Sequence, residues 1–422
     1  GMQVSVVASL TGRQLLAVQA SPTWGPQDLL RRLPGRAAAD DCRRRIFWGA
    51  TELSSACSLG DLGVTDGARL SLVVSRPLHV LTASGDGAAR IWSAPSGECL
   101  RTLRGHDGSV LSAAFSPSGD AVVTCSDDGT ARVWSTESGE CLLTLRGHGA
   151  RVCSAAFSPD GQAVVSSAAD GTAKVWRAAS GHCLHTLVGH WGGHFFPATF
   201  SPDSQTLLTS GYDSTAKIWS AASGDRLHTL AGHGYMVVAG EFAPDCQTVA
   251  TGSDDSTAKI WSTASGDCLH TLRGHDDSVI STAFSPDGRL VATGCADTTA
   301  RVWAAASGEC LHALRAHSAR VCSAGFSPDG RAVATCSDDG AARLWSADSG
   351  GCLRTLAAPR RCPVRCAAFS PDGQAVVTAD GDGATVWCAN SGDLLCSLGG
   401  RAGPALCAAF APESGGRTET AA

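Results

Sequence analysis

Tyrosine, methionine and lysine are scarce in this chain of 422 residues. It has two Tyr and two Met, and its 33 basic residues include only Lys174, Lys217 and Lys259. No apolar run is as long as a membrane-spanning helix requires, and the first residues lack the charged and apolar stretches of a secretory signal. The net charge of −6 offers no concentrated positive field for nucleic acid. We therefore expect neither a membrane nor a nucleic-acid partner.

Cysteine, by contrast, is abundant, with 19 residues. Six of them recur at one position of a repeated strand pattern: Cys99, Cys141, Cys183, Cys268, Cys310 and Cys352. Because matching positions of neighbouring repeats should exceed disulfide reach, we expect small buried hydrophobes in a reduced intracellular compartment, cytoplasmic or nuclear. Cys362 and Cys366 form a lone C-x3-C pair without a second pair, so we expect neither a metal site nor a cofactor.

Tryptophan sets the period of the chain. Eight of the 11 Trp recur at intervals of 42 or 43 residues: Trp92, Trp134, Trp176, Trp219, Trp261, Trp303, Trp345 and Trp387. Each period contains four short β-type runs separated by turn sequences, and in one period these are 110–115, 121–125, 130–135 and 141–145. Short runs at this spacing predict an all-β repeat array.

Most periods also contain a Gly-His pair and an Asp six residues before the Trp, as in Gly105-His106 and Asp128. This pattern resembles the WD-repeat β-propeller family from about residue 78 onward. The resemblance implies that a His, a Ser, the Asp and the Trp form a hydrogen-bonded chain in each blade. The three complete sets are His106, Ser126, Asp128 and Trp134; His233, Ser253, Asp255 and Trp261; and His317, Ser337, Asp339 and Trp345. We expect thinner networks where Ala168, Gly211 or Cys295 replaces the Ser, and the weakest blade at the end.

The number of strands predicts eight blades. The first Trp period has only three strands, at 78–83, 88–93 and 99–103, and a spare strand at 405–411 follows the last period. If the spare strand completes the first blade, the ring closes and no sheet edge inside it stays exposed. We therefore expect a mainly β fold with an eight-bladed propeller at 77–413 and a disordered tail at 414–422. Seven blades and an unpaired fragment are the alternative.

Residues 1–76 lack the repeat. Strands, a turn and a short helix follow one another there, and the segments "MQVSVVASLTG", "RRIFWG" and "ARLSLVV" are similar to ubiquitin. The resemblance implies an α+β, β-grasp domain that docks on ubiquitin-binding proteins through an apolar patch of Leu10, Ile46 and Val73. Arg45 stands where the family buries a Leu, and the patch is lost if Ile46 turns inward to replace it.

Loops that differ between repeats are the candidates for partner binding. The loop after Gly-His carries Trp191 and His194 in one repeat and Tyr235 and Met236 in the next. Aromatic and Met side chains are favoured anchors at interfaces, although Trp191 could instead fold onto its own loop. Arg151 and Arg320 occupy this loop in other repeats and could pair with an acidic partner.

We find no convergent set of acid, base and nucleophile outside the repeat pattern, which argues against an enzyme. The expected function is a monomeric interaction scaffold, in which the propeller binds one protein or peptide and the ubiquitin-like domain docks a second. Two alternatives are a ubiquitin–proteasome adaptor and a ribosome-assembly factor of the Notchless type, whose architecture is similar.

Overall fold

The computed structural model divides the chain into two compact units, residues 1–77 and 78–422. In the second unit the structure describes residues 78–190, 198–357, 362–399 and 405–412. In the first it describes five strands and a few residues between them, at 21, 23–24, 28–29, 58–59, 61 and 64–65. The expected tail at 414–422 lies outside the described residues.

The first unit contains one mixed sheet. Its strands are β1 (Met2–Ala8), β2 (Gln14–Ala20), β3 (Arg43–Trp48), β4 (Thr51–Glu52) and β5 (Ala68–Ser75). They lie in the order β2-β1-β5-β3-β4, and β1 runs parallel to β5 at the centre. Val4, Leu29, Leu59 and Leu70 are fully buried, so the unit has a core of its own.

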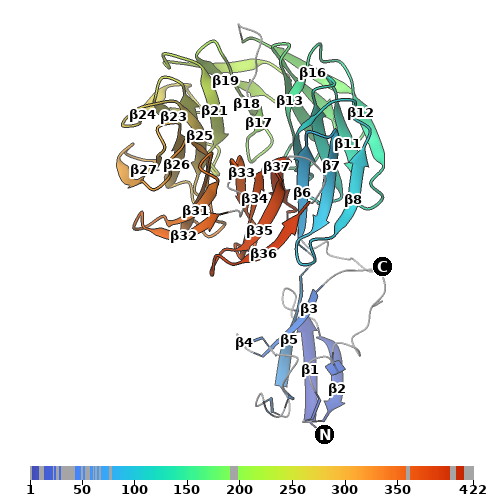
Figure 1. The fold of residues 1–422 in the computed structure, drawn as a ribbon. Helices are drawn as coiled ribbons and strands as arrows, with labels where there is room; N and C mark the ends of the chain where they lie inside the picture. The colour runs from blue at the N-terminus through green and yellow to red at the C-terminus, as the bar shows by residue number, and fades with distance from the viewer. Residues whose placement is uncertain are drawn as a thin grey trace. The chain divides into compact units, whose positions relative to one another are not determined.

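The second unit is a ring of eight four-stranded antiparallel sheets (Figure 1). Blade 1 consists of β37 (Ala405–Phe410), β6 (His79–Ser84), β7 (Ala88–Ser93) and β8 (Cys99–Arg104). Blade 2 contains β9 (Val110–Phe115), β10 (Ala121–Ser126), β11 (Ala131–Ser135) and β12 (Cys141–Leu145). Blade 3 contains β13 (Val152–Phe157), β14 (Ala163–Ala168), β15 (Thr172–Arg177) and β16 (Cys183–Val188). Blade 4 contains β17 (Thr199–Phe200), β18 (Thr206–Ser210), β19 (Thr215–Ser220) and β20 (Arg226–Ala231).

The other four blades repeat this arrangement. Blade 5 contains β21 (Val237–Phe242), β22 (Thr248–Ser253), β23 (Ala258–Ser262) and β24 (Cys268–Leu272). Blade 6 contains β25 (Val279–Phe284), β26 (Leu290–Cys295), β27 (Ala300–Ala304) and β28 (Cys310–Leu314). Blade 7 contains β29 (Val321–Phe326), β30 (Ala332–Ser337), β31 (Ala341–Ser346) and β32 (Cys352–Ala357). Blade 8 contains β33 (Cys366–Phe369), β34 (Ala375–Asp380), β35 (Gly383–Cys388) and β36 (Leu394–Leu398). The prediction of eight blades is confirmed.

Strands from the two ends of the second unit share blade 1. The strand β37 pairs antiparallel with β6, with Phe410 opposite Val80 and Ala408 opposite Thr82. In Figure 1 the red β37 accordingly lies beside the blue β6. Ala405, Ala408 and Phe410 pack into the core between blades 8 and 1. The inner strand of blade 1 is therefore supplied by the far end of the chain.

The hydrophobic core lies between the blades, because each sheet buries its faces against its neighbours. Between blades 4 and 5, for example, Leu208, Ile218 and Leu230 pack with Phe242 and Trp261. A register shift occurs in every blade where the repeat Trp meets the outermost strand, as between Val133 and Trp134. This β-bulge places Trp134 opposite Cys141.

The outer-strand cysteines differ from the expectation. Cys99, Cys141, Cys268 and Cys352 are exposed, and Cys183 and Cys310 are half-buried. The outermost strand has no further sheet beyond it, so a residue there is not enclosed as a residue of the middle strands is. These side chains are consequently not the buried hydrophobes that their regular spacing suggested.

Side chains of the outer strands connect neighbouring blades. His312 Nε2 donates a hydrogen bond to the Asp348 carbonyl oxygen at 2.9 Å, and the His312 ring packs on Gly350. Gly350 has a φ of +68°, and a Cβ there would lie 2.8 Å from His312. Glycine is thus required in this turn both for its backbone conformation and for the close approach.

Candidate functional site

A hydrogen-bonded chain connects the His, the Asp and the Trp in six of the eight blades. In blade 5, His233 Nδ1 donates to Asp255 at 2.9 Å, and His233 Nε2 lies 2.8 Å from Thr251 Oγ1. The same Thr oxygen accepts the indole N–H of Trp261 at 2.8 Å. The Thr hydroxyl can donate to His233 Nε2 while it accepts from the Trp, so each buried polar group has a partner.

The hydroxyl that connects His to Trp differs from the expected one. Thr124, Thr251 and Thr335 hold this position, rather than Ser126, Ser253 and Ser337. The Ser side chains instead connect the Asp turn to the loop after Gly-His. Ser253 Oγ donates to the Tyr235 carbonyl oxygen of that loop at 3.0 Å and accepts from the Asp255 amide of the turn at 3.1 Å. The Ser therefore orders the loop, and the Thr completes the buried chain.

The blades in which the Ser is replaced keep the complete chain, contrary to the expected thinning. His148 and Trp176 meet at Ser166, His190 and Trp219 meet at Thr209, and His275 and Trp303 meet at Thr293. Because this hydroxyl lies two residues before Ala168, Gly211 or Cys295, their substitution leaves it in place. The bonds that depend on the replaced residue are those to the loop carbonyl and to the Asp amide, and Cys295 retains both.

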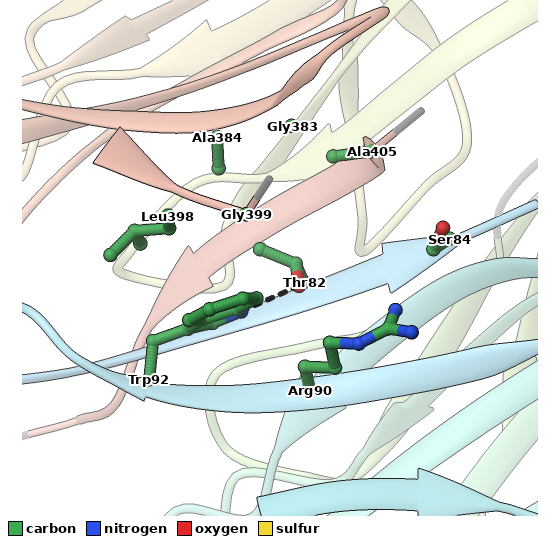
Figure 2. A pocket seen from close by; sticks show the side chains of 9 residues that line it. All are labelled: Thr82, Ser84, Arg90, Trp92, Gly383, Ala384, Leu398, Gly399 and Ala405. Carbon is green, nitrogen blue, oxygen red and sulfur yellow. Dashed lines mark hydrogen bonds between the residues drawn. The ribbon is translucent and has the colours of Figure 1, made fainter. Parts of the chain in front are cut away.

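Blades 1 and 8 have different polar contacts. Their indoles still donate to Thr82 and Thr378, both at 2.9 Å, but in the described residues no His bonds either hydroxyl. In blade 1, Arg90 forms an ion pair with Asp86. A small recess lies between the two blades, lined by Thr82, Arg90 and Trp92 and, from blade 8, by Gly383 and Leu398 (Figure 2). Its described lining contains no convergent acid, base and nucleophile.

Burial determines the charge of the network. Burial lowers the pKa of six His, and their Asp partners offset part of this effect. The six are His106, His148, His190, His233, His275 and His317. Burial alone would raise the pKa of Asp128, but hydrogen bonds from Thr130 and His106 outweigh it and lower this pKa to about 2. The network thus consists of neutral imidazoles and ionised carboxylates near neutral pH.

One group of side chains resembles a metal site. The ligand atoms of His275, Cys295 and Asp297 all lie within 4.8 Å of one another. Each atom already has a protein partner, since His275 bonds to Asp297 and the Cys295 thiol donates to the Asp277 carbonyl oxygen at 3.0 Å. Cys295 therefore does what Ser253 does in blade 5, and the group is the blade network with sulfur in place of oxygen.

The predicted partner-binding residues are only partly described. Trp191 and His194 lie outside the described residues. Tyr235 is 66% exposed, and the neighbouring Met236 is half-buried. Hydrogen bonds to its backbone hold the Tyr235 loop in place. The Ser253 hydroxyl and the Asp254 amide donate to the carbonyl oxygens of Tyr235 and Met236, respectively.

A second exposed tyrosine accompanies Tyr235. Tyr212, in the turn between β18 and β19, is 39% exposed. The Val237 amide donates to the Gly211 carbonyl oxygen at 3.1 Å, which ties the Tyr235 loop of blade 5 to the Tyr212 turn of blade 4. Sequence reasoning missed Tyr212 because this position belongs to the recurring Asp turn, where the other seven blades have a non-aromatic residue. The rarity of Tyr in the chain was the available signal.

The two loop arginines have different surroundings. Arg320 forms an ion pair with Asp338 of its own blade, and this contact raises its pKa. Ala169 takes the place of Asp338 beside Arg151, and among the described residues no ion pair involves Arg151. The charge of Arg320 is therefore partly neutralised by Asp338. The charge of Arg151 has no such ion-pair partner among the described residues, so it is the better candidate for contact with an acidic partner.

The ubiquitin-like patch is described only at the backbone. Leu10 lies outside the described residues. The register of β3 and β5 pairs Ile46 with Leu72 and Arg45 with Val73, which places positions 46 and 73 on opposite faces of the sheet. This register does not favour one patch that contains both residues, and the patch stays a prediction.

Comparison with known proteins identifies the repeats. The WD domain, G-beta repeat model matches seven segments: residues 97–135, 139–177, 181–220, 224–262, 266–304, 308–346 and 350–387. A stretch of 44 residues is 50% identical to Nuclear distribution protein PAC1 of Mycosarcoma maydis, and it spans 10% of each chain. Among the described residues, no helix is long and apolar enough to cross a membrane.

The difference between seven matches and eight blades has a structural cause. Each matched segment runs from the outermost strand of one blade to the third strand of the next, as residues 97–135 run from β8 to β11. The inner three strands of blade 1 come from both ends of the unit, so no continuous segment contains them. With seven repeats matched over more than half of its length, the chain belongs to the WD domain, G-beta repeat family.

Proposed function

We propose that the chain is a non-enzymatic protein-interaction scaffold whose propeller binds a protein or peptide through the tyrosine surface of blades 4 and 5. We define this surface as Tyr212, Tyr235 and Met236. One observation carries the proposal: the only two Tyr of the chain are both exposed, on loops joined by the Val237–Gly211 hydrogen bond. Tyr offers a large contact area at a small entropic cost, which makes it a frequent interface anchor.

The surroundings of the tyrosine surface support a binding role over a structural one. The hydrogen bonds that order the Tyr235 loop are accepted by the backbone carbonyl oxygens of Tyr235 and Met236. The exposed ring of Tyr235 therefore contributes little to the order of the loop. A rigid loop with an exposed aromatic ring loses little entropy on binding. Arg151, on blade 3, adds a charge for an acidic residue of the partner.

Selection of displayed peptides against the full-length protein tests the proposal. Peptides selected against the protein should lose about 30-fold in affinity when Tyr212 and Tyr235 are both changed to Ala, the effect of removing a hot spot of about 2 kcal/mol. The melting temperature should not change. Leu269→Ala is the matched control, since Leu269 is exposed on the outer strand of blade 5. Equal losses in both variants, or a large drop in melting temperature in the Tyr variant, would contradict the proposal.

The first unit is proposed to dock a second protein, as a β-grasp domain of the ubiquitin-like type. A five-stranded sheet with its first and last strands parallel at the centre supports this interpretation. If the patch of Leu10, Ile46 and Val73 forms, Ile46→Ala in the full chain should abolish binding of a ubiquitin-interacting helical peptide. Binding that persists in this variant would remove the patch, and with it the adaptor function.

A further inference from the structure

One backbone hydrogen bond joins the loop after Gly-His to the Asp turn in five blades. The last residue of the loop, just before the inner strand, accepts it, and the residue before the recurring Asp donates it, at 2.9–3.2 Å. The five pairs are Ser109 and Asp127, Arg151 and Ala169, Met236 and Asp254, Ser278 and Ala296, and Arg320 and Asp338. The two residues of each pair therefore lie side by side, and the pairs of different blades can be compared directly.

Blade 7 has a complete Arg–Asp pair, and blade 3 has only its basic half. In blade 7, the side chains of Arg320 and Asp338 form an ion pair beside the backbone bond. In blade 3, the exposed Arg151 holds the arginine position, but Ala169 stands where the Asp would be. The geometry that lets an acidic group reach the arginine is therefore present in blade 3, while the chain itself does not supply that group at this position.

Blade 5 has the acidic half of the same pair. Asp254 is half-buried, and Met236 stands beside it where blade 7 has the arginine. In the described part of the chain, no ion pair involves Asp254. Asp276 and Asp277, in the loop of the neighbouring blade 6, are both exposed and add negative charge beyond Asp254. Blade 5 therefore offers an acidic site to which the chain contributes no basic partner.

The tyrosine surface lies between these two incomplete pairs. Blade 4 shares one core with blade 3 and another with blade 5, so the three blades are consecutive in the ring. Tyr212 and Tyr235 therefore have the positive charge of Arg151 on one side and the negative charge of Asp254 on the other. Asp127 of blade 2 is a further acidic residue at this position, but Arg151 separates it from the tyrosine surface. The surface is thus apolar and aromatic at its centre, with opposite charges at its two ends.

We propose that the tyrosine surface binds an extended peptide segment that has an acidic residue at one end, a basic residue at the other and apolar residues between them. This inference rests on the proposed function and names the chemistry of its partner. The acidic residue pairs with Arg151 and the basic residue with Asp254, so the partner completes the two pairs that the chain leaves incomplete. Packed sheets lie about 10 Å apart, so blades 3 and 5 are about 20 Å apart, which an extended chain spans with about six residues.

Selection of random displayed peptides against the full-length protein tests the charge pattern. The selected peptides should share an acidic and a basic residue about six positions apart, with apolar or aromatic residues between them. A synthetic peptide with the shared pattern is then the probe. Replacement of its acidic residue by Lys should lower its affinity about tenfold, and Arg151→Glu in the protein should restore the affinity of this altered peptide. Such a reversal shows that the two charges are in contact, which a single substitution does not.

Substitutions that copy other blades test each end without disturbing the fold. Ala169→Asp gives Arg151 the internal partner found in blade 7, so it should weaken binding of the unaltered probe about fivefold. Ala296→Asp is the matched control, because it makes the same change at the same position of blade 6, opposite Ser278, and it should not weaken binding. Asp254→Ala should also weaken binding about fivefold, and Ala already occupies this position in blades 3 and 6. The melting temperature of all three variants should match that of the wild type.

The possible failures of this proposal and of the proposed function are distinct. Peptides that lose affinity when Tyr212 and Tyr235 are changed to Ala, but not in Ala169→Asp or Asp254→Ala, would overturn the charge pattern and leave the proposed function intact. Equal weakening by Ala169→Asp and Ala296→Asp would also overturn the pattern, because it would reflect only the added negative charge. Peptides that bind without the two tyrosines would contradict both.

Discussion

At the scale of single residues, the buried Thr of the second strand is the junction of each blade. Thr251 and Ser253 both lie on β22 and are both fully buried, so composition and burial do not separate their roles. Their hydrogen-bond partners separate the two roles. Thr251 Oγ1 connects the rings of His233 and Trp261, and the Ser253 hydroxyl donates to the backbone carbonyl oxygen of Tyr235. The sequence predicts that a network exists, because the His, the Asp and the Trp recur together. It cannot predict which of two hydroxyls reaches the rings, since that depends on side-chain directions along the strand.

Thr251→Val tests this assignment with a substitution of equal shape. The variant keeps the packing but leaves His233 Nε2 and Trp261 Nε1 without their partner in a buried site. We expect a loss of about 2–4 kcal/mol, because each unpaired buried group costs about 1–3 kcal/mol. Thermal melting of the full-length protein measures it. Ser253→Ala is the control and should cost about 1 kcal/mol. A larger loss in Ser253→Ala than in Thr251→Val would return the central role to the Ser.

At the scale of elements, the strands follow from the sequence because their ends are marked by turns. The predicted strands at 110–115 and 141–145 match β9 and β12 in full, and that at 121–125 is one residue shorter than β10. The loops are less predictable, because their contacts depend on residues distant in sequence. Asp338 pairs with Arg320 because the strands of blade 7 bring them together, and the Tyr212 turn joins the Tyr235 loop because blades 4 and 5 are neighbours in the ring.

The strand β37 offers a test at this scale. A chain that ends at residue 404 lacks Ala405, Ala408 and Phe410, which exposes one edge of β6 and opens the core between blades 8 and 1. We expect a melting temperature lower by at least about 10 °C, together with aggregation through the free edge. Light scattering and thermal melting measure these effects. A chain that ends at residue 412 is the control, because it keeps β37 intact. If both truncations melt alike, β37 is not needed for closure.

At the scale of the whole molecule, the repeat multiplies a small electrostatic effect. The pKa of each of six His is lowered on folding, so the unfolded chain binds more protons than the folded chain below about pH 6.5. Stability should therefore fall as the pH decreases from about 6.5. Glu241 acts in the opposite direction, because burial raises its pKa to about 7. Its folded carboxyl holds a proton that the unfolded one releases, so this residue favours folding as the pH falls from 7 towards 4.5.

Six imidazoles should outweigh one carboxyl, so we expect the melting temperature to fall steadily from pH 7 to pH 5. Glu241→Gln separates the two effects. The amide oxygen can still accept the Phe284 amide, which lies 3.1 Å from the Glu241 carboxylate, but the buried charge is gone. The variant should melt above the wild type at pH 8 and lose this advantage towards pH 5, so its melting temperature should fall more steeply with acidification. A Glu241→Gln melting temperature that is constant between pH 7 and pH 5 would mean that the folded imidazoles accept protons as readily as the unfolded ones.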